Sequence, residues 1–197
     1  MMITGEATIL GEVTRVRRED TGTDLFENYW TKEEAGHLYL HGFYNLFADF
    51  GLAYQPPIRM VDSPLELGMT WVTEGVESFN LDGTPSGFDP FDYSLMVDFE
   101  GEITVPAGVF YAYGVGFDDS FPLLRGPDGR YFDIFGHNLG ERPRKGRTDI
   151  TEWYTDGVGL TRRTHYGGEQ HTLDLQWWNP PVPVRESSWG RVKATFH

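Results

Sequence analysis

Val105-Pro106-Ala107-Gly108-Val109-Phe110 decides the fold class, because this segment joins two runs of residues that both favour extended structure. Leu95 to Val105 leads into it and Val109 to Phe117 leads out, and both runs contain many of the aromatic and β-branched side chains typical of strands. Proline at the second and glycine at the fourth position suit a type I turn. A second corner, Asp156-Gly157, lies within Trp153 to Leu160 and is a hairpin signal. Together these two segments predict an all-β protein.

The composition agrees with a protein of many short strands. The chain has 197 residues, of which 39% are hydrophobic and 15% aromatic, and it contains 24 glycines and 12 prolines. We expect a single β domain over residues 1–197, built on a curved antiparallel sheet that forms a half-barrel or a sandwich. Residues 118–150 have no sustained period and many chain breakers, so they predict a loop-rich insertion that is either functional or mobile. One short hairpin is expected inside it, about Pro127-Asp128-Gly129.

Other strands are expected from alternation and from the residues that punctuate it. Tyr54-Gln55-Pro56-Pro57 is not expected in a central strand, because proline cannot donate to a ladder. Leu65, Leu67, Met69 and Trp71 recur at period two and predict one strand face, whereas residues 75–92 predict a loop. The remaining expected strands are Ala7–Arg18, Tyr29-Trp30, Leu38–Tyr44, Leu160–Tyr166, His171–Trp178 and Ser188–His197.

Charge and cysteine usage exclude several classes of function. The chain has 16 basic and 30 acidic residues and a formal net charge of −14, so neither nucleic acid nor an anionic membrane surface is an expected partner. It has no cysteine, which excludes disulfides, thiolate metal sites and a cysteine nucleophile. No apolar run is long enough for a transmembrane helix. We expect a cytoplasmic protein if Met1 is the native start, and a cell-envelope or secreted protein if a signal peptide has been removed.

Four segments in order carry a resemblance to a known family. They are Tyr54-Gln55-Pro56-Pro57, Pro64-Leu65-Glu66-Leu67-Gly68-Met69-Thr70-Trp71, Val105 to Phe110, and Trp153 to Leu160. The chain resembles a loosely defined group of uncharacterised bacterial β-rich envelope or lipoprotein-like proteins. The resemblance implies a curved antiparallel sheet similar to the half-barrels of lipoprotein carriers, and it implies no catalytic residues. The chain departs from the pattern in lacking an export signal and a lipid-anchoring cysteine, and in its long insertion.

Motifs of catalysis and metal binding are missing from the chain. There is no Gly-x-Ser-x-Gly elbow, no phosphate-binding loop and no complete dinucleotide fingerprint. His37 and His41 would lie roughly 13 Å apart on one face of a strand, too far to share a metal ion. His165 and His171 flank a Gly167-Gly168 turn and are expected to form a polar surface pair across it. The sequence therefore predicts no metal and no cofactor.

The aromatic side chains are the remaining candidates for a binding site. The return strand after Gly108 carries bulky residues on one face, and Ala112, Gly114 and Gly116 leave its other face nearly bare. Bare positions allow a ligand to approach the backbone closely. Arg162 and Arg163 point to opposite faces, so one guanidinium would reach a ligand's carboxylate or phosphate. The candidate ligand-binding residues are Tyr111, Tyr113, Gly114, Trp153, Tyr154, Arg163 and Trp177.

Three functional hypotheses remain open at this stage. The leading one is a non-catalytic binding module for an apolar or amphipathic small molecule or lipid. The alternative is a cofactor-independent β-barrel enzyme, which would place His137, His165 or Asp133 inside a cavity as a perturbed acid or base. A structural or interaction protein without a pocket is the third, and a packed aromatic core would favour it.

Overall fold

A computed structural model describes residues 2–20, 22, 24–117, 123–140, 149–156, 158–167 and 169–174. This part of the chain forms strands and turns and no helix, as expected for an all-β protein. Its strands are β1 (Met2–Ile9), β2 (Glu12–Asp20), β3 (Leu25–Lys32), β4 (Leu38–Asn45), β5 (Phe50–Val61), β6 (Thr70–Asn80), β7 (Phe91–Val105), β8 (Gly108–Phe117), β9 (Leu124–Arg125), β10 (Tyr131–Phe132), β11 (Asn138–Gly140), β12 (Asp149–Thr155), β13 (Gly159–Gly167) and β14 (Glu169–Asp174).

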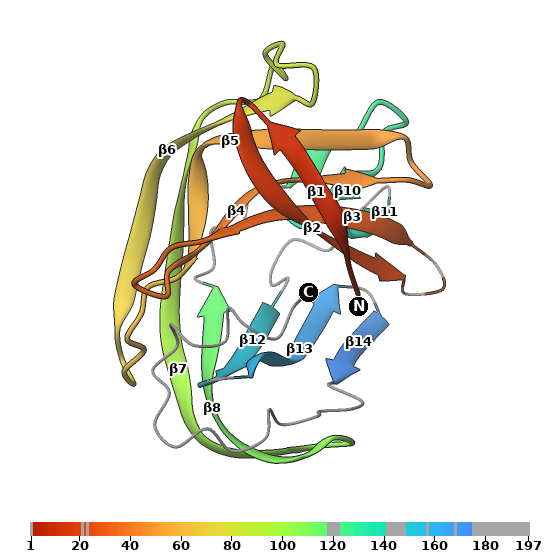
Figure 1. The fold of residues 1–197 in the computed structure, drawn as a ribbon. Coiled ribbons are helices and arrows are strands. Elements are labelled where there is room, and N and C mark those ends of the chain that lie inside the picture. Colours follow the sequence, from red (N-terminus) through yellow and green to blue (C-terminus); the bar gives the residue numbers. More distant parts are fainter. Residues whose placement is uncertain are drawn as a thin grey trace.

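Eleven of these strands form one antiparallel sheet in the order β1-β2-β3-β4-β5-β6-β7-β8-β12-β13-β14. The sheet is curved, and within the described residues its two end strands are not paired with each other (Figure 1). Strand β6 joins strands β1–β5 of the sheet to the strands that follow it, because its residues 77–80 pair with β5 and its residues 70–76 pair with β7. Strands β9, β10 and β11 form a separate small sheet inside the insertion.

The hairpins predicted from turn residues are confirmed. Strands β7 and β8 meet at Pro106-Ala107, with Val105 opposite Gly108. Strands β12 and β13 turn back at the Asp156 corner, with Thr155 opposite Gly159. The short hairpin about Pro127-Asp128-Gly129 is formed by β9 and β10.

The single strand expected over Ala7–Arg18 is wrong, because a tight turn divides it into β1 and β2. Leu10 and Gly11 form this turn with φ angles of 47° and 91°. Both lie in the left-handed region, where glycine is the residue of choice. Across this turn the buried positions change from the odd-numbered Ile9 to the even-numbered Thr14 and Val16, so one continuous alternation does not fit the segment.

The exclusion of Tyr54-Gln55-Pro56-Pro57 from a central strand is also wrong. The segment lies within β5, between β4 and β6 in the sheet. The ladder with β4 skips residues 54–57, and the ladder with β6 ends at Gln55. Neither ladder therefore needs a hydrogen bond donated by Pro56 or Pro57, and under this condition a sheet accommodates proline.

The boundary between strand and loop around β6 also differs from expectation. A turn with a hydrogen bond from Met69 N to Glu66 O precedes the strand, so β6 begins at Thr70 and Leu67 is exposed. Strand β6 continues to Asn80, and β7 begins at Phe91, so the expected loop over residues 75–92 is confined to residues 81–90. The strands expected beyond Asp174 lie outside the described residues.

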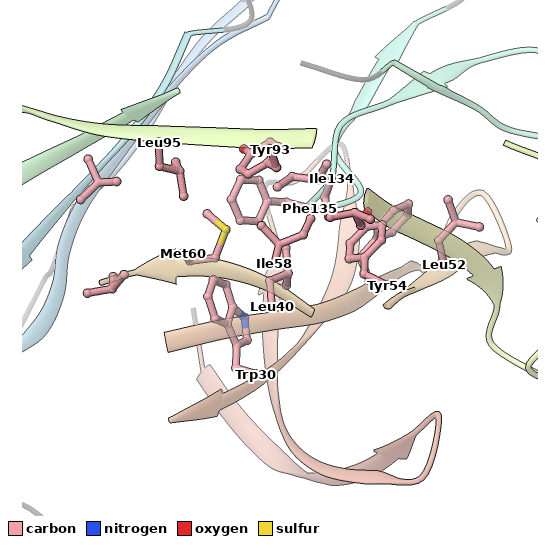
Figure 2. Packing of buried hydrophobic residues seen from close by; sticks show 14 of the residues in the cluster. Trp30, Leu40, Leu52, Tyr54, Ile58, Met60, Tyr93, Leu95, Ile134 and Phe135 are labelled. Atoms are coloured by element: carbon pink, nitrogen blue, oxygen red, sulfur yellow. The ribbon is translucent and has the colours of Figure 1, made fainter. Parts of the chain in front are cut away.

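The largest apolar core lies between the curved sheet and the insertion. Figure 2 shows Trp30, Ile58 and Tyr93 from three strands facing Ile134 and Phe135 from the insertion. Phe132, Ile134 and Phe135 are completely buried there. Residues 123–140 of the insertion therefore contribute side chains to the core. We call the face of the sheet that meets this core its inner face.

Candidate functional site

The insertion is held on the inner face by side chains from three neighbouring strands. Three consecutive carbonyl oxygens, of residues 134–136, each accept one hydrogen bond from such a side chain. Tyr54 Oη donates to the first at 3.0 Å, Asn28 Nδ2 to the second at 2.7 Å and Asn45 Nδ2 to the third at 2.8 Å. Buried backbone carbonyls need partners, and here β5, β3 and β4 provide them. The insertion therefore occupies a fixed position against the sheet.

Within this segment Asp133 and His137 form a buried pair. Asp133 Oδ2 lies 2.5 Å from His137 Nδ1, and Asp133 Oδ1 accepts the backbone N–H groups of Phe135 and His137, both at 2.9 Å. The imidazole packs edge-on against Phe26 at a centroid distance of 4.5 Å. A carboxylate that fixes one imidazole nitrogen is the arrangement that orients a general base in many enzymes.

A second buried cluster joins the two ends of the sheet. Arg163 of β13 donates from Nη1 to both carboxylate oxygens of Glu19 of β2 at 2.9 Å, across 144 positions of sequence. Its Nε donates to Glu152 at 2.7 Å. Arg17 Nε lies 2.8 Å from the Glu19 carboxylate. The two arginines balance the two glutamates, and the side chains of Arg163, Glu19 and Glu152 are each only 1% exposed.

Glu19 and Arg163 stabilise each other in their ionised forms, whereas burial and the like charge of Arg163 lower the pKa of Arg17. Burial by itself would raise the pKa of Glu19, but Arg163 and Arg17 outweigh it and hold this pKa below its usual value. Burial would lower the pKa of Arg163, but Glu152 and Glu19 raise it above the ordinary arginine value. Tyr154 donates to Glu152, and burial together with that negative charge raises its pKa well above normal. The Arg163 guanidinium is therefore committed to carboxylates of the protein.

Sequence reasoning missed Arg17, Glu19 and Glu152. Glu152 lies directly opposite Arg163 in the β12–β13 hairpin, but the register shifts by one residue between Trp153 and Tyr154. Counting residues back from the Asp156-Gly157 turn would therefore have placed Arg162, and not Arg163, opposite Glu152. No local signal pointed to Glu19.

The structure divides the predicted ligand-binding residues between the two faces of the sheet. Tyr113, Tyr154 and Arg163 belong to the inner face, where Tyr113 and Tyr154 lie opposite each other in register. Gly114 and Trp153 are paired in the same ladder at the intervening position, so they belong to the outer face. Tyr111 follows the alternation of Tyr113 but lies near the exposed end of β8, and Trp177 lies outside the described residues.

Side chains of neighbouring strands cover the face of β8 that carries the small residues Ala112, Gly114 and Gly116. A Cβ atom added at Gly114 would lie 2.8 Å from Phe99 Cβ and 3.3 Å from Trp153 Nε1. A Cβ atom added at Gly116 would lie 2.8 Å from Asp98 Oδ2. Ala112 is completely buried. The small residues therefore make room for side chains of β7 and β12.

Arg162 and Arg163 point to opposite faces, as the alternation predicted. Arg163 enters the buried cluster, whereas Arg162 donates from Nη2 to Thr104 O at 2.8 Å. The Arg162 guanidinium also lies 5.9 Å from the centre of the Trp153 ring. Both interactions hold Arg162 on the outer face.

The far ends of β7 and β8 project beyond the rest of the sheet (Figure 1). The ladder between β6 and β7 ends at Met96, and the ladder between β8 and β12 ends at Tyr113. In these ladders residues 99–105 of β7 pair only with β8, and residues 108–112 of β8 pair only with β7. We call this two-stranded segment the ribbon.

One face of the ribbon exposes large side chains to solvent. Val109 is 62% exposed and Tyr111 is 53% exposed, and the half-buried Tyr113 continues their row along β8. The Tyr111 and Tyr113 rings meet edge to face, with centroids 6.0 Å apart. Glu100 and Glu102 lie opposite the two tyrosines in register, and Tyr111 Oη donates to Glu100 at 2.6 Å. We call these five residues the tyrosine face.

His37 and His41, considered above as metal ligands, contact other side chains in the structure. His41 Nε2 lies 2.8 Å from Thr31 Oγ1, and His37 Nδ1 lies 3.0 Å from Asp62 Oδ1. His165 and His171 lie opposite each other in the backbone register of β13 and β14. Among the described residues no group of three or more histidine, cysteine, aspartate or glutamate side chains has the arrangement to hold a metal ion. The described part of the chain also has no helix of the length and apolarity that would cross a membrane.

Comparison with known proteins found no relative of this chain. No protein-family model matches the sequence, no curated protein matches it, and no solved structure matches the fold. The function proposed below therefore rests on the residues and the geometry of this chain.

Proposed function

We propose that this protein is a non-catalytic binding module for an apolar or amphipathic small molecule or lipid, and that the ligand lies on the tyrosine face. The observation that carries this proposal is the exposure of Val109 and Tyr111 side by side on a projecting ribbon. Burying one large apolar side chain is worth about 1.5–3 kcal/mol, so a ligand that covers this row gains affinity from each member. The edge-to-face packing of Tyr111 on Tyr113 holds the row in place before a ligand arrives.

The tyrosine face continues the inner face along the projecting ribbon, and the part of the inner face that meets the insertion is the other place where a half-barrel would hold an apolar ligand. In this chain the insertion fills the described inner face with Phe132, Ile134 and Phe135. Protein cores pack as densely as organic crystals, so a ligand there would have to displace these side chains. The tyrosine face needs no such displacement, and for this reason we place the ligand on it.

The test is the binding of a neutral alkyl probe by equilibrium dialysis. Dodecyl maltoside, below its critical micelle concentration, is dialysed against the protein and against the variant Val109→Ser/Tyr111→Ser. We expect the variant to lose at least three-quarters of the bound probe. Phe47→Ser is the matched control, because Phe47 is also 62% exposed but lies in the β4–β5 turn. Equal binding by all three proteins would refute the proposal, and so would the failure of the unmodified protein to bind both this probe and probes with the same dodecyl chain and a charged head group.

A cofactor-independent enzyme is the second candidate, and the buried Asp133–His137 pair is the observation in its favour. In such an enzyme His137 would act as the general base, with Asp133 as its positioning residue. A substrate must then reach the imidazole, which is only 7% exposed. Diethyl pyrocarbonate acylates accessible imidazoles, and mass spectrometry of the folded protein would measure its reaction at His137. Rapid acylation would favour the enzyme, whereas protection until unfolding would count against it.

A further inference from the structure

We infer that the ligand of the tyrosine face is an amphipathic cation, with an ammonium group attached to an apolar body. This inference rests on the proposed function and adds the charge of the ligand to it. The observation behind it is the pairing of two exposed carboxylates with two tyrosine rings on the same face of the ribbon.

The register of the ribbon places the carboxylates beside the rings. Glu100 lies opposite Tyr113 and Glu102 lies opposite Tyr111, and residues opposite each other in an antiparallel pair project to the same side. The hydrogen bond from Tyr111 Oη to Glu100 confirms that these side chains meet. Glu100 and Glu102 are both exposed, so they remain available to a ligand from solvent.

No cation of the described chain neutralises this pair of charges. Neither Glu100 nor Glu102 takes part in an ion pair among the described residues. The arginine that contacts the ribbon is Arg162, and its interactions with Thr104 O and the Trp153 ring hold it on the outer face. The two charges therefore add to the field of a chain that already carries a net charge of −14, and this field attracts cations from solution.

The rings and the aliphatic side chain select the kind of cation. The electron-rich face of a tyrosine attracts an ammonium group and accepts its methyl groups as apolar contacts, which a hydrated metal ion does not provide. Val109 extends the row away from the carboxylates at the position opposite Thr104, so it offers an apolar surface to the rest of the ligand. An ammonium group between the glutamates and the rings, with an alkyl body over Val109, uses every member of the tyrosine face.

The test uses three probes with the same dodecyl chain and different head groups. Dodecyltrimethylammonium, dodecyl maltoside and dodecyl sulfate are each dialysed against the protein below their critical micelle concentrations, at about 0.1 M ionic strength, where the Debye length is about 10 Å. We expect the cation to bind most tightly and the sulfate least tightly. In the variant Glu100→Gln/Glu102→Gln, the affinity for the cation should fall about 3- to 30-fold, as for the loss of two exposed charge pairs. The affinity for the maltoside should change less than twofold.

The control variant is Glu74→Gln/Glu77→Gln, which removes the same charge from exposed positions of β6. It should leave the affinity for the cation within about twofold, since charges this far from the ligand are largely screened. If both double variants weaken the cation equally, general charge attraction explains the preference and the inference is wrong. If maltoside binds as tightly as the cation, the inference is wrong but the proposed function stands. If no probe binds, the proposed function itself fails.

Discussion

Replacement of Arg163 by methionine should cost this protein much of its stability. The side chains of Arg163, Glu19 and Glu152 are each 1% exposed, and one guanidinium binds both carboxylates. Methionine keeps most of the volume but leaves the two buried carboxylates facing each other with Arg17 as their remaining partner. Removing one member of a buried ion pair costs about 3–5 kcal/mol, and we expect Arg163→Met to lower the free energy of unfolding by this amount. For a chain of this length the melting temperature should fall by roughly 6–20 °C.

A second variant separates the cost of an unpaired charge from the net value of the cluster. In Arg17→Met/Glu19→Met/Glu152→Met/Arg163→Met all four charges are removed together. Buried ionic clusters replaced as a whole by hydrophobic residues of similar size are often no less stable, so most of the lost stability should return. Urea unfolding followed by circular dichroism and tryptophan fluorescence would measure both variants. A loss under 1 kcal/mol in Arg163→Met would refute the account of the cluster as a buried, mutually dependent set of charges.

The same cluster predicts how stability depends on pH. The pKa of Glu19 is lower in the folded protein than in the unfolded chain, where it is about 4.3. The folded state therefore binds the Glu19 proton less tightly, and the resulting stabilisation is fully present above the unfolded value and is lost as the pH falls through the folded one. The stability difference between the unmodified protein and Glu19→Gln should accordingly shrink below about pH 4. A difference that stays constant down to pH 2 would contradict this assignment.

Three further predictions concern other parts of the structure. Gly136→Ala should destabilise the protein by at least about 2 kcal/mol more than Gly140→Ala. Both glycines have φ near +85°, but only at Gly136 would a Cβ atom collide with the Phe43 ring. Comparison of the urea midpoints of the two variants tests this. Phe132→Ala should cost about 3–5 kcal/mol by leaving a cavity between insertion and sheet, and a loss below 1 kcal/mol would show that the insertion contributes little to the core. Burial, aided by the negative charge of Glu27 and by Tyr44, raises the pKa of Tyr29 to about 12. The stabilisation that this shift contributes should therefore be lost as the pH rises from about 10 to 12. In unfolding experiments over this range, the free energy of unfolding should fall less steeply for Tyr29→Phe than for the unmodified protein.

Local chemistry was enough to predict the hairpins at Pro106-Ala107, Pro127-Asp128-Gly129 and Asp156, but not the one at Leu10-Gly11. Pro106, Gly108 and Asp156 mark turns through their own backbone preferences, and the strands beside them follow. The opposite orientation of Arg162 and Arg163 needed only the period of two. These features involve residues close together in the chain, so a single sequence contains the information for them.

Long-range pairing was beyond the reach of the sequence. The Pro56-Pro57 pair fits into β5 because two ladders happen to leave these residues out, and only the partners' registers show this. The contact between Glu19 and Arg163 depends on the curvature of the whole sheet. The packing of the insertion depends on Asn28, Asn45 and Tyr54, whose positions in β3, β4 and β5 carry no local mark of their role.

The most direct test of the central claim is to locate a bound ligand by its effect on methyl resonances. A dodecylammonium nitroxide, added below its critical micelle concentration to methyl-labelled protein, broadens the signals of methyl groups near it. We predict strong broadening at Val109 on the ribbon and much weaker broadening at Leu40 and Leu52, which are buried on the inner face in β4 and β5. Broadening at Leu40 and Leu52 that exceeds the broadening at Val109 would place the ligand in the interior and contradict the account.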